Sequence, residues 1–194
     1  MISKTVLFVL AVLVLVFYAA SASAWDGERK GFILGIGVGS GYLSYSQTME
    51  GEKLGSDDVG PFNTDFKIGY APNNMFLIYW MSKVSWFGME NVYGDNVTIS
   101  NGVGCAGVSY YLNEFTPSPY LFCGIGYSTW DTPFEEDSKT WTGPGVSFGT
   151  GYEFSHHFNI EASVTYGKPS TKELGAEFAT KSLSIGLMFN IMGY

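Results

Sequence analysis

Two short motifs in the sequence have the residue types of an enzyme site. Residues 145–149, GVSFG, match the G-x-S-x-G pattern around the nucleophilic serine of many hydrolases, with Ser147 as the candidate. Such a serine needs a sharp turn from a strand into a helix, but a strand-like alternation continues to residue 154. Residues 102–107, GVGCAG, spell G-x-G-x-x-G, whose dinucleotide-binding form requires a helix after the glycines. Because a strand pattern runs through both segments, we predict that neither one is catalytic or binds a cofactor.

The only histidines, His156 and His157, are adjacent in a short connection between two alternating segments. An imidazole can act as a general base or bind a metal ion, but a metal site needs further ligands at suitable spacing. No cysteine or third histidine accompanies this pair. We therefore predict no catalytic residue, no metal and no cofactor, and we expect that the protein is not an enzyme.

Four charged residues are a stronger signal, because they interrupt segments of apolar and small side chains: Asp65, Lys67, Glu153 and Glu161. In FNTDFKIGYA, residues 62–71, large side chains occupy every second position, and Asp65 and Lys67 stand between them. Alternation with a period of two is the pattern of a β-strand with two different faces. The four charges therefore share the face that the large apolar side chains avoid.

The same alternation recurs along the chain and predicts an all-β protein. In GFILGIGVGSGYLSYS, residues 31–46, glycine takes most positions opposite the apolar ones. The connections are alternately short and long, and the long ones carry most of the acidic residues. An even number of strands, with short turns at one end and long loops at the other, is typical of outer-membrane barrels. The eight segments are 31–46, 62–71, 75–86, 101–112, 120–130, 143–154, 158–167 and 181–191.

We therefore predict an eight-stranded antiparallel up-and-down transmembrane β-barrel. Its large apolar side chains would face lipid, and its glycines, small polar residues and four charges would face the lumen. A charge facing hydrocarbon at mid-depth costs about 2–4 kcal/mol, so the shared phase of the four charges supports this orientation. The segment 75–86 is apolar on both phases, and its faces are the least well separated.

The interior of an eight-stranded barrel is only wide enough for side chains to fill, and an unpaired lysine there would be costly. We hypothesise that Lys67 pairs across the lumen with Glu161 or Glu153 and closes it. In the alternative interpretation, these charges and Asp65 line a small hydrated conduit and set its ion preference.

Two cysteines, Cys105 and Cys123, lie on neighbouring predicted strands. An exported protein meets oxidising conditions, so a disulfide between them is one interpretation. The alternation places Cys105 inward and Cys123 outward, which favours the other interpretation, two small apolar residues of a barrel wall.

The first residues have the three parts of a secretory signal peptide. Lys4 provides the positive start, an apolar run follows over residues 6–20, and residues 22–24, ASA, form a small-residue cleavage site. We predict a signal peptide over residues 1–24 and an outer-membrane barrel domain over residues 25–194. The short turns and both ends of that domain would lie in the periplasm.

The charge balance argues against a nucleic-acid partner, because 18 acidic residues face 10 basic ones and the formal net charge is −8. We expect a monomer whose partners are outer-membrane lipid and lipopolysaccharide, the barrel-assembly machinery and a surface ligand of the long loops 47–61, 87–98, 131–140 and 168–179. The acidic residues of these loops include Glu50, Glu52, Asp57, Asp58, Glu90, Asp95, Glu135, Glu136 and Asp137.

Over residues 25–194 the chain resembles the small eight-stranded outer-membrane barrels: the OmpA transmembrane domain, OmpX and the opacity-type proteins of the porin family. The resemblance rests on GFILGIGVGSGYLSY, GVGCAGVSYYLNEFTPSPYLFCGIGYS and LSIGLMFNI. Members of this group usually end in an aromatic residue in phase with the lipid face. Here Phe189 and Ile191 are in phase, but Tyr194 is out of phase.

These features predict an integral protein of a Gram-negative outer membrane, with a structural or cell-surface interaction role and a narrow or plugged lumen. The alternative is a small porin that passes ions or small solutes. A lipid-modifying enzyme of the outer leaflet is a more distant alternative, because His156 and His157 fall in a predicted periplasmic turn, far from that substrate.

Overall fold

A computed structural model describes residues 28–90, 94, 96–135, 138–173 and 175–194. The predicted signal peptide, residues 1–24, lies outside the described residues. The strands form one sheet in the order β2-β1-β3-β4-β5-β6-β7-β8-β10-β9. The strands are β1 (Gly31–Met49), β2 (Glu52–Val59), β3 (Phe62–Asn73), β4 (Phe76–Glu90), β5 (Asn96–Tyr111), β6 (Ser118–Asp131), β7 (Trp141–Ser155), β8 (Phe158–Gly167), β9 (Ser170–Glu173) and β10 (Ala176–Gly193).

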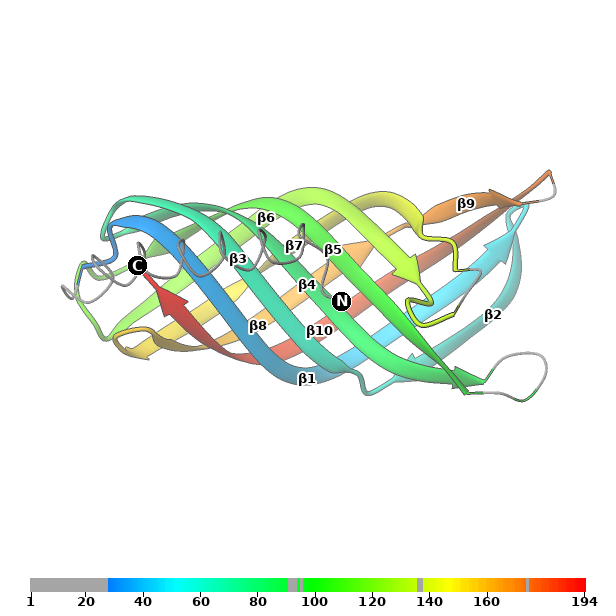
Figure 1. The fold of residues 1–194 in the computed structure, drawn as a ribbon, viewed down its shortest axis with the longest axis horizontal. Helices are drawn as coiled ribbons and strands as arrows, with labels where there is room; N and C mark the ends of the chain where they lie inside the picture. Colours follow the sequence, from blue (N-terminus) through cyan, green and yellow to red (C-terminus); the bar gives the residue numbers. More distant parts are fainter. Residues whose placement is uncertain (1–27, 91–93, 95, 136–137, 174) are drawn as a thin grey trace, which may run out of the picture.

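The sheet closes on itself because β1 pairs with β10 from Leu34↔Gly193 to Met49↔Phe178. The closed wall contains β1, β3, β4, β5, β6, β7, β8 and β10, each antiparallel to its neighbours (Figure 1). The predicted up-and-down barrel of eight strands is confirmed. Among the described residues, no helix is long and apolar enough to cross a membrane.

The alternation of the sequence separates two faces of the wall. On β1, Ile36 is 59% exposed and Val38 is 52% exposed, whereas Gly35 and Gly37 point inward. The inward glycines leave room for larger neighbours: a Cβ on Gly37 would overlap the side chain of Asn190. The outer apolar belt suits lipid, and the small inner residues allow a narrow barrel to hold large lumen side chains.

The strand that is apolar on both phases, β4, is also divided in this way. Leu77, Tyr79 and Met81 are buried in the lumen, and Ile78 and Trp80 face outward. The lumen can hold these large residues because glycines of β5 and β6 face them; a Cβ on Gly107 would lie 3.1 Å from the Tyr79 ring and from the Met81 methyl.

Two of the predicted long loops need correction. Residues 47–61 contain β2, which pairs with β1, and residues 168–179 contain β9, which pairs with β10. Since β1 and β10 extend well past their neighbours in the wall, β2 and β9 supply hydrogen-bond partners that these extensions would otherwise lack. Both faces of β2 are exposed over most of its length, so no apolar alternation marked it in the sequence.

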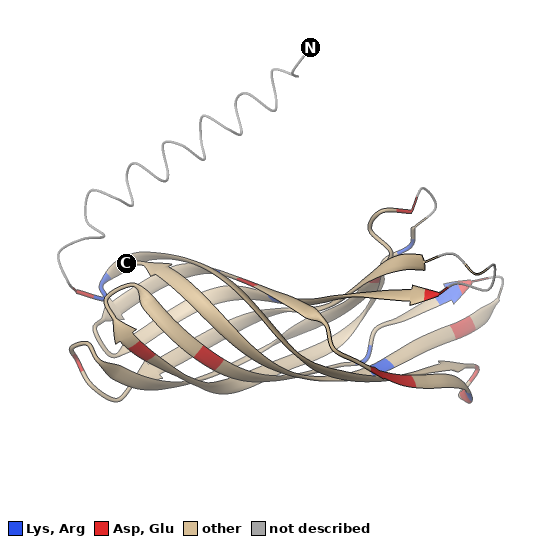
Figure 2. Cartoon of the chain, turned by 90° about the horizontal axis from the view of Figure 1, so that it is seen from below, with Lys and Arg blue, Asp and Glu red and all other residues tan. Residues whose placement is uncertain are grey.

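The extended strands form a region that we call the crown, residues 43–59, 87–90, 96–99, 170–173 and 175–182. It combines the sheet β2-β1-β10-β9 with the upper part of the β4–β5 hairpin, which pairs as far as Glu90↔Asn96. The charged positions gather mostly toward this long-loop end, away from the end with the short turns (Figure 2). Of the acidic loop residues predicted above, Asp95, Glu136 and Asp137 lie outside the described residues.

Candidate functional site

Four charged side chains meet in the lumen: Asp65 and Lys67 of β3, Lys83 of β4 and Glu161 of β8. Lys67 Nζ lies 2.7 Å from Glu161 Oε2 and 3.0 Å from Asp65 Oδ2. Lys83 Nζ lies 2.7 Å from Asp65 Oδ2 and 2.5 Å from Glu161 Oε1. Each ammonium group contacts both carboxylates, so the charges of this lumen ion cluster balance.

The lumen ion cluster is shielded from water. Its most exposed member, Lys83, is only 6% exposed, and Glu161 is completely buried. Tyr120 donates a hydrogen bond of 2.8 Å to Glu161 Oε2. The ring of Phe122 lies 5.1 Å from Lys83 Nζ, within the range of a cation–π contact. Since an unpaired buried charge is strongly destabilising, the four charges must be present together.

The cluster contains Asp65, Lys67 and Glu161 from the sequence hypothesis, and Lys67 pairs with Glu161 rather than with Glu153. Sequence reasoning missed Lys83, because its strand is apolar on both phases. The available signal was the charge itself: the rule that keeps the other charges away from lipid also assigns Lys83 to the lumen.

Glu153 belongs to a second ion pair at the short-turn end. Arg29 Nε donates to Glu153 Oε2 over 2.6 Å, and both side chains are buried. Nη1 of Arg29 donates to the carbonyl oxygens of Asn74, Asn113 and Glu114 over 2.8, 3.0 and 3.1 Å. One guanidinium thus joins two turns to β7. Sequence reasoning missed Arg29, because it precedes the first strand and no alternation reaches it.

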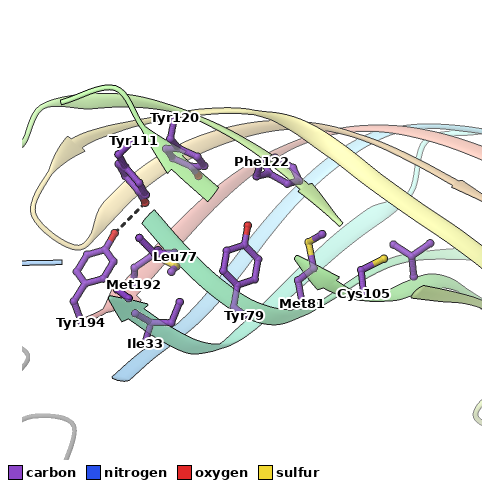
Figure 3. Close-up of a cluster of buried hydrophobic side chains, with 12 residues drawn as sticks. Ile33, Leu77, Tyr79, Met81, Cys105, Tyr111, Tyr120, Phe122, Met192 and Tyr194 are labelled. Atoms are coloured by element: carbon purple, nitrogen blue, oxygen red, sulfur yellow. Dashed lines mark hydrogen bonds between the residues drawn. The ribbon is translucent and has the colours of Figure 1, made fainter. Parts of the chain in front are cut away.

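Tyr194, the aromatic residue that is out of phase with the lipid face, joins the Arg29–Glu153 ion pair and completes a closure of the lumen at the short-turn end. Tyr194 is 3% exposed and points into the lumen, where its hydroxyl donates to Glu153 Oε1 over 3.0 Å. Its hydroxyl also lies 3.2 Å from the Tyr111 hydroxyl (Figure 3). The Arg29 guanidinium lies 4.2 Å from the centre of the Tyr111 ring. The departure of Tyr194 from the usual phase therefore has a structural role: it places the last aromatic ring inside the barrel.

Small polar side chains occupy the next level toward the crown. Asn63 lies two residues before Asp65 on β3, and Ser85 lies two residues after Lys83 on the antiparallel β4. The Ser85 hydroxyl lies 3.3 Å from that of Ser184. These residues line a cavity of about 10 Å³, which is close to the space that one water molecule needs. Oδ1 of Asn63 and Oδ1 of Asp65 have no hydrogen-bond partner within the described structure. This level therefore has polar groups that water could satisfy.

An aromatic cluster fills the lumen at the base of the crown: Leu43, Tyr45, Phe87, Ile99 and Trp130. The Tyr45 ring centre lies 5.0 Å from that of Trp130 and 5.7 Å from that of Phe87. Tyr45 donates to the sulfur of Met89 over 3.4 Å. The aromatic cluster is a third closure of the lumen, built from apolar contacts rather than charges.

The remaining chemical candidates are Ser147 and the two histidines, and the histidines border the short-turn closure, where the His157 ring centre lies 5.8 Å from that of Tyr194. Ser147 is buried in the lumen wall, and its hydroxyl has no hydrogen-bond partner within the part of the chain that the structure describes. In the turn between β7 and β8, Nδ1 of His156 lies 3.3 Å from the Thr116 hydroxyl and Nδ1 of His157 lies 2.8 Å from the carbonyl oxygen of Met192. Among the described residues, no group of three or more histidine, cysteine, aspartate or glutamate side chains is arranged to hold a metal ion.

The two cysteines are free and face opposite sides of the wall. Cys105 is completely buried in the lumen beside Met81 (Figure 3), whereas Cys123 is exposed on the outer face. The disulfide that the sequence left open is therefore not formed, because alternate faces of neighbouring strands keep the two thiols apart.

Comparison with known proteins agrees with this architecture. Residues 10–190 match the family described as "Outer membrane protein beta-barrel domain". Neisserial surface protein A is 14% identical, with 83% of this chain and 96% of that chain covered and a TM-score of 0.53. Ail of Yersinia pestis, in complex with the heparin analogue sucrose octasulfate, is 21% identical, with 82% and 99% covered and a TM-score of 0.43. OprG of Pseudomonas aeruginosa is 14% identical, with 85% and 98% covered and a TM-score of 0.46. No curated protein matches the chain.

Proposed function

Because the chain belongs to the outer membrane protein β-barrel family, we propose that it is a plugged outer-membrane barrel whose crown serves in contacts at the cell surface. The observation that carries this proposal is the lumen ion cluster, in which two ammonium groups and two carboxylates contact one another at 2.5–3.0 Å. Side chains rather than a water-filled channel occupy the interior at this level.

Three separate closures, two built on ion pairs and one on apolar contacts, support a plug. Arg29, Glu153 and Tyr194 close the short-turn end, the lumen ion cluster lies further along, and the aromatic cluster closes the base of the crown. Buried charges that satisfy one another resist displacement, because moving any one of them leaves another unpaired in a region of low dielectric constant.

The crown supports a role at the surface. It extends the sheet beyond the apolar belt, and β2 lies at an edge of the sheet order, with only β1 as its paired neighbour. An exposed edge strand offers backbone N–H and C=O groups to another chain. The acidic residues Asp57 and Asp58 on β2 give that edge a negative charge. We propose a protein partner that adds to this edge.

The proposed topology follows from the same features. Residues 1–24 would direct export and be removed, and the assembly machinery of the outer membrane would insert residues 25–194. The short turns would face the periplasm, and the crown would face the outside among lipopolysaccharide molecules. No catalytic role is proposed for any residue, and a monomer suffices for every closure described above.

Conductance across a planar lipid bilayer tests the plug. The refolded chain should insert without steady open conductance, because each of the three closures alone would block the passage of ions. The competing function is a small ion channel, which the unsatisfied polar atoms of Asn63 and Asp65 favour. A steady open conductance of the unmodified protein, abolished by heat unfolding, would refute the plug and support the channel.

A further inference from the structure

A cavity of about 610 Å³ opens at the top of the barrel, above the aromatic cluster. Its volume lies within the range of about 300–1,000 Å³ that is usual for small-molecule sites. The cavity is separate from the lumen ion cluster. Its lining includes Ile99, Trp130, Asp131, Lys139, Trp141 and Glu173.

Two indole side chains form the apolar part of this cavity. Trp130 of β6 and Trp141 of β7 are direct cross-strand partners, so their side chains emerge on the same face of the wall. Trp130 is held by Tyr45 and Phe87 below it, with ring centres 5.0 and 5.7 Å away. Trp141 is only partly buried. The Trp141 ring, which a ligand can reach, therefore lies beside the Trp130 ring, which its neighbours hold in place.

The charged residues of the cavity are two acidic side chains, Asp131 and Glu173, and one basic side chain, Lys139. Asp131 accepts hydrogen bonds from the hydroxyls of Ser138 and Thr140, which fix its carboxylate at the rim. Glu173 forms an ion pair of 3.5 Å with Lys139, whose side chain is 66% exposed. Such a solvent-exposed pair contributes little, so a ligand cation can take the place of the lysine.

The surrounding crown strengthens the negative potential, because its described acidic residues outnumber the basic ones. A mouth lined by one sign of charge concentrates small ions of the opposite sign. The described acidic residues on and around the crown are Glu50, Glu52, Asp57, Asp58, Glu90, Asp131, Glu135, Glu173 and Glu177, and the basic ones are Lys53, Lys139, Lys168, Lys172 and Lys181.

We propose that this cavity is a binding site for a small organic cation of the quaternary ammonium type. The face of an indole attracts such a cation more strongly than other aromatic rings do. Trp141 would contact the cationic head, with Asp131 and Glu173 balancing its charge, while Trp130 and Ile99 form an apolar floor. This inference goes beyond the proposed function. The cavity lies on the crown side of the closures, so binding there does not depend on whether the lumen is plugged or conducts.

The test compares choline with 3,3-dimethyl-1-butanol, which has the same shape but a neutral carbon in place of the nitrogen. Isothermal titration calorimetry on the full refolded chain in lipid nanodiscs, with empty nanodiscs subtracted, measures both affinities. We expect choline to bind about tenfold more tightly than the alcohol, the ratio that a partly desolvated cation–π contact gives. Equal affinities would overturn the proposal in favour of a neutral ligand such as a sugar, and absence of choline binding would overturn it outright.

Variants locate the site. Trp141→Leu should weaken choline binding about tenfold, since it removes the exposed indole, whereas Trp86→Leu, on the outer face, should leave binding unchanged. Lys139→Ala should tighten binding and Glu173→Gln should weaken it, because the first removes a repulsive charge and the second an attractive one. Neither Lys139 nor Glu173 is buried, so these two variants keep the test decisive if Trp141→Leu does not fold. Unchanged affinity in both of them would show that choline binds elsewhere and would overturn the assignment.

Discussion

Replacement of Lys83 by methionine tests whether the lumen ion cluster acts as a unit. Methionine keeps most of the apolar stem but removes the ammonium, so Asp65 and Glu161 would share Lys67 alone. At an effective dielectric constant of about 20, contacts of 2.7 and 2.5 Å contribute about 6 kcal/mol each before desolvation. Desolvation of the ammonium and its repulsion by the neighbouring Lys67 offset most of this attraction. We therefore expect the free energy of unfolding to fall by about 3–5 kcal/mol, the usual cost of removing one partner of a buried ion pair.

The double variant Lys83→Met/Glu161→Gln removes one charge of each sign. It leaves Lys67 Nζ at 3.0 Å from Asp65 Oδ2 as a balanced pair. We therefore expect its cost to be smaller than the sum of the two single costs by about 1–3 kcal/mol, the coupling that contacting residues show. Urea unfolding in lipid vesicles, followed by tryptophan fluorescence, gives the free energies, and heat-modifiable migration on gels verifies the folded state.

Lys53→Met on the exposed strand β2 is the matched control, and it should change the free energy of unfolding by less than about 1 kcal/mol. Two results would refute the reasoning. One is a cost for Lys83→Met equal to that of the control, and the other is a double variant whose cost equals the sum of the single costs. Either would mean that water reaches the cluster and screens its charges.

Two further predictions concern the two faces of the wall. A lipid-soluble maleimide should label Cys123 and leave Cys105 unmodified in the folded protein, as peptide mass spectrometry after quenching would show; labelling of both without unfolding would contradict the assigned faces. Gly151→Ala should lower the free energy of unfolding by about 1–3 kcal/mol, because a Cβ there would overlap the Tyr120 ring. Gly55→Ala, with no atom within 4 Å of the added Cβ, should be nearly neutral in the same urea assay, and equal costs for both would show that the lumen is loosely packed.

The sequence predicted the wall of the barrel because lipid imposes a strict pattern on it. Along β1 and β10, every second side chain must be apolar, and the residues between them must be small or polar. A single-residue slip would turn all of them to the wrong side. That requirement also placed Asp65, Lys67, Glu153 and Glu161 inward, where the structure has them.

The partners of those charges were harder to predict, because a narrow lumen accepts both large apolar and charged residues. Lys83 lies among Met81, Tyr79 and Leu77 on the inward face of β4, so neither face of that strand looked polar. Arg29 and β2 lie outside the lipid-facing pattern, and no comparable constraint acts on them.

The distribution of chemistry along the lumen bears on the choice between a plug and a channel. On the inward face of β4, apolar and aromatic residues give way to Lys83, then to the small polar Ser85, and then to Phe87 of the aromatic cluster. Neutralising the lumen ion cluster would leave the aromatic cluster intact, and enlarging the space around Trp130 would leave the ions paired. Ions would therefore need the disruption of both clusters, and of the Arg29–Glu153 closure at the short-turn end, before they could pass. A barrel selected for conduction has no need of three closures, whereas one that stabilises a surface-exposed crown benefits from each.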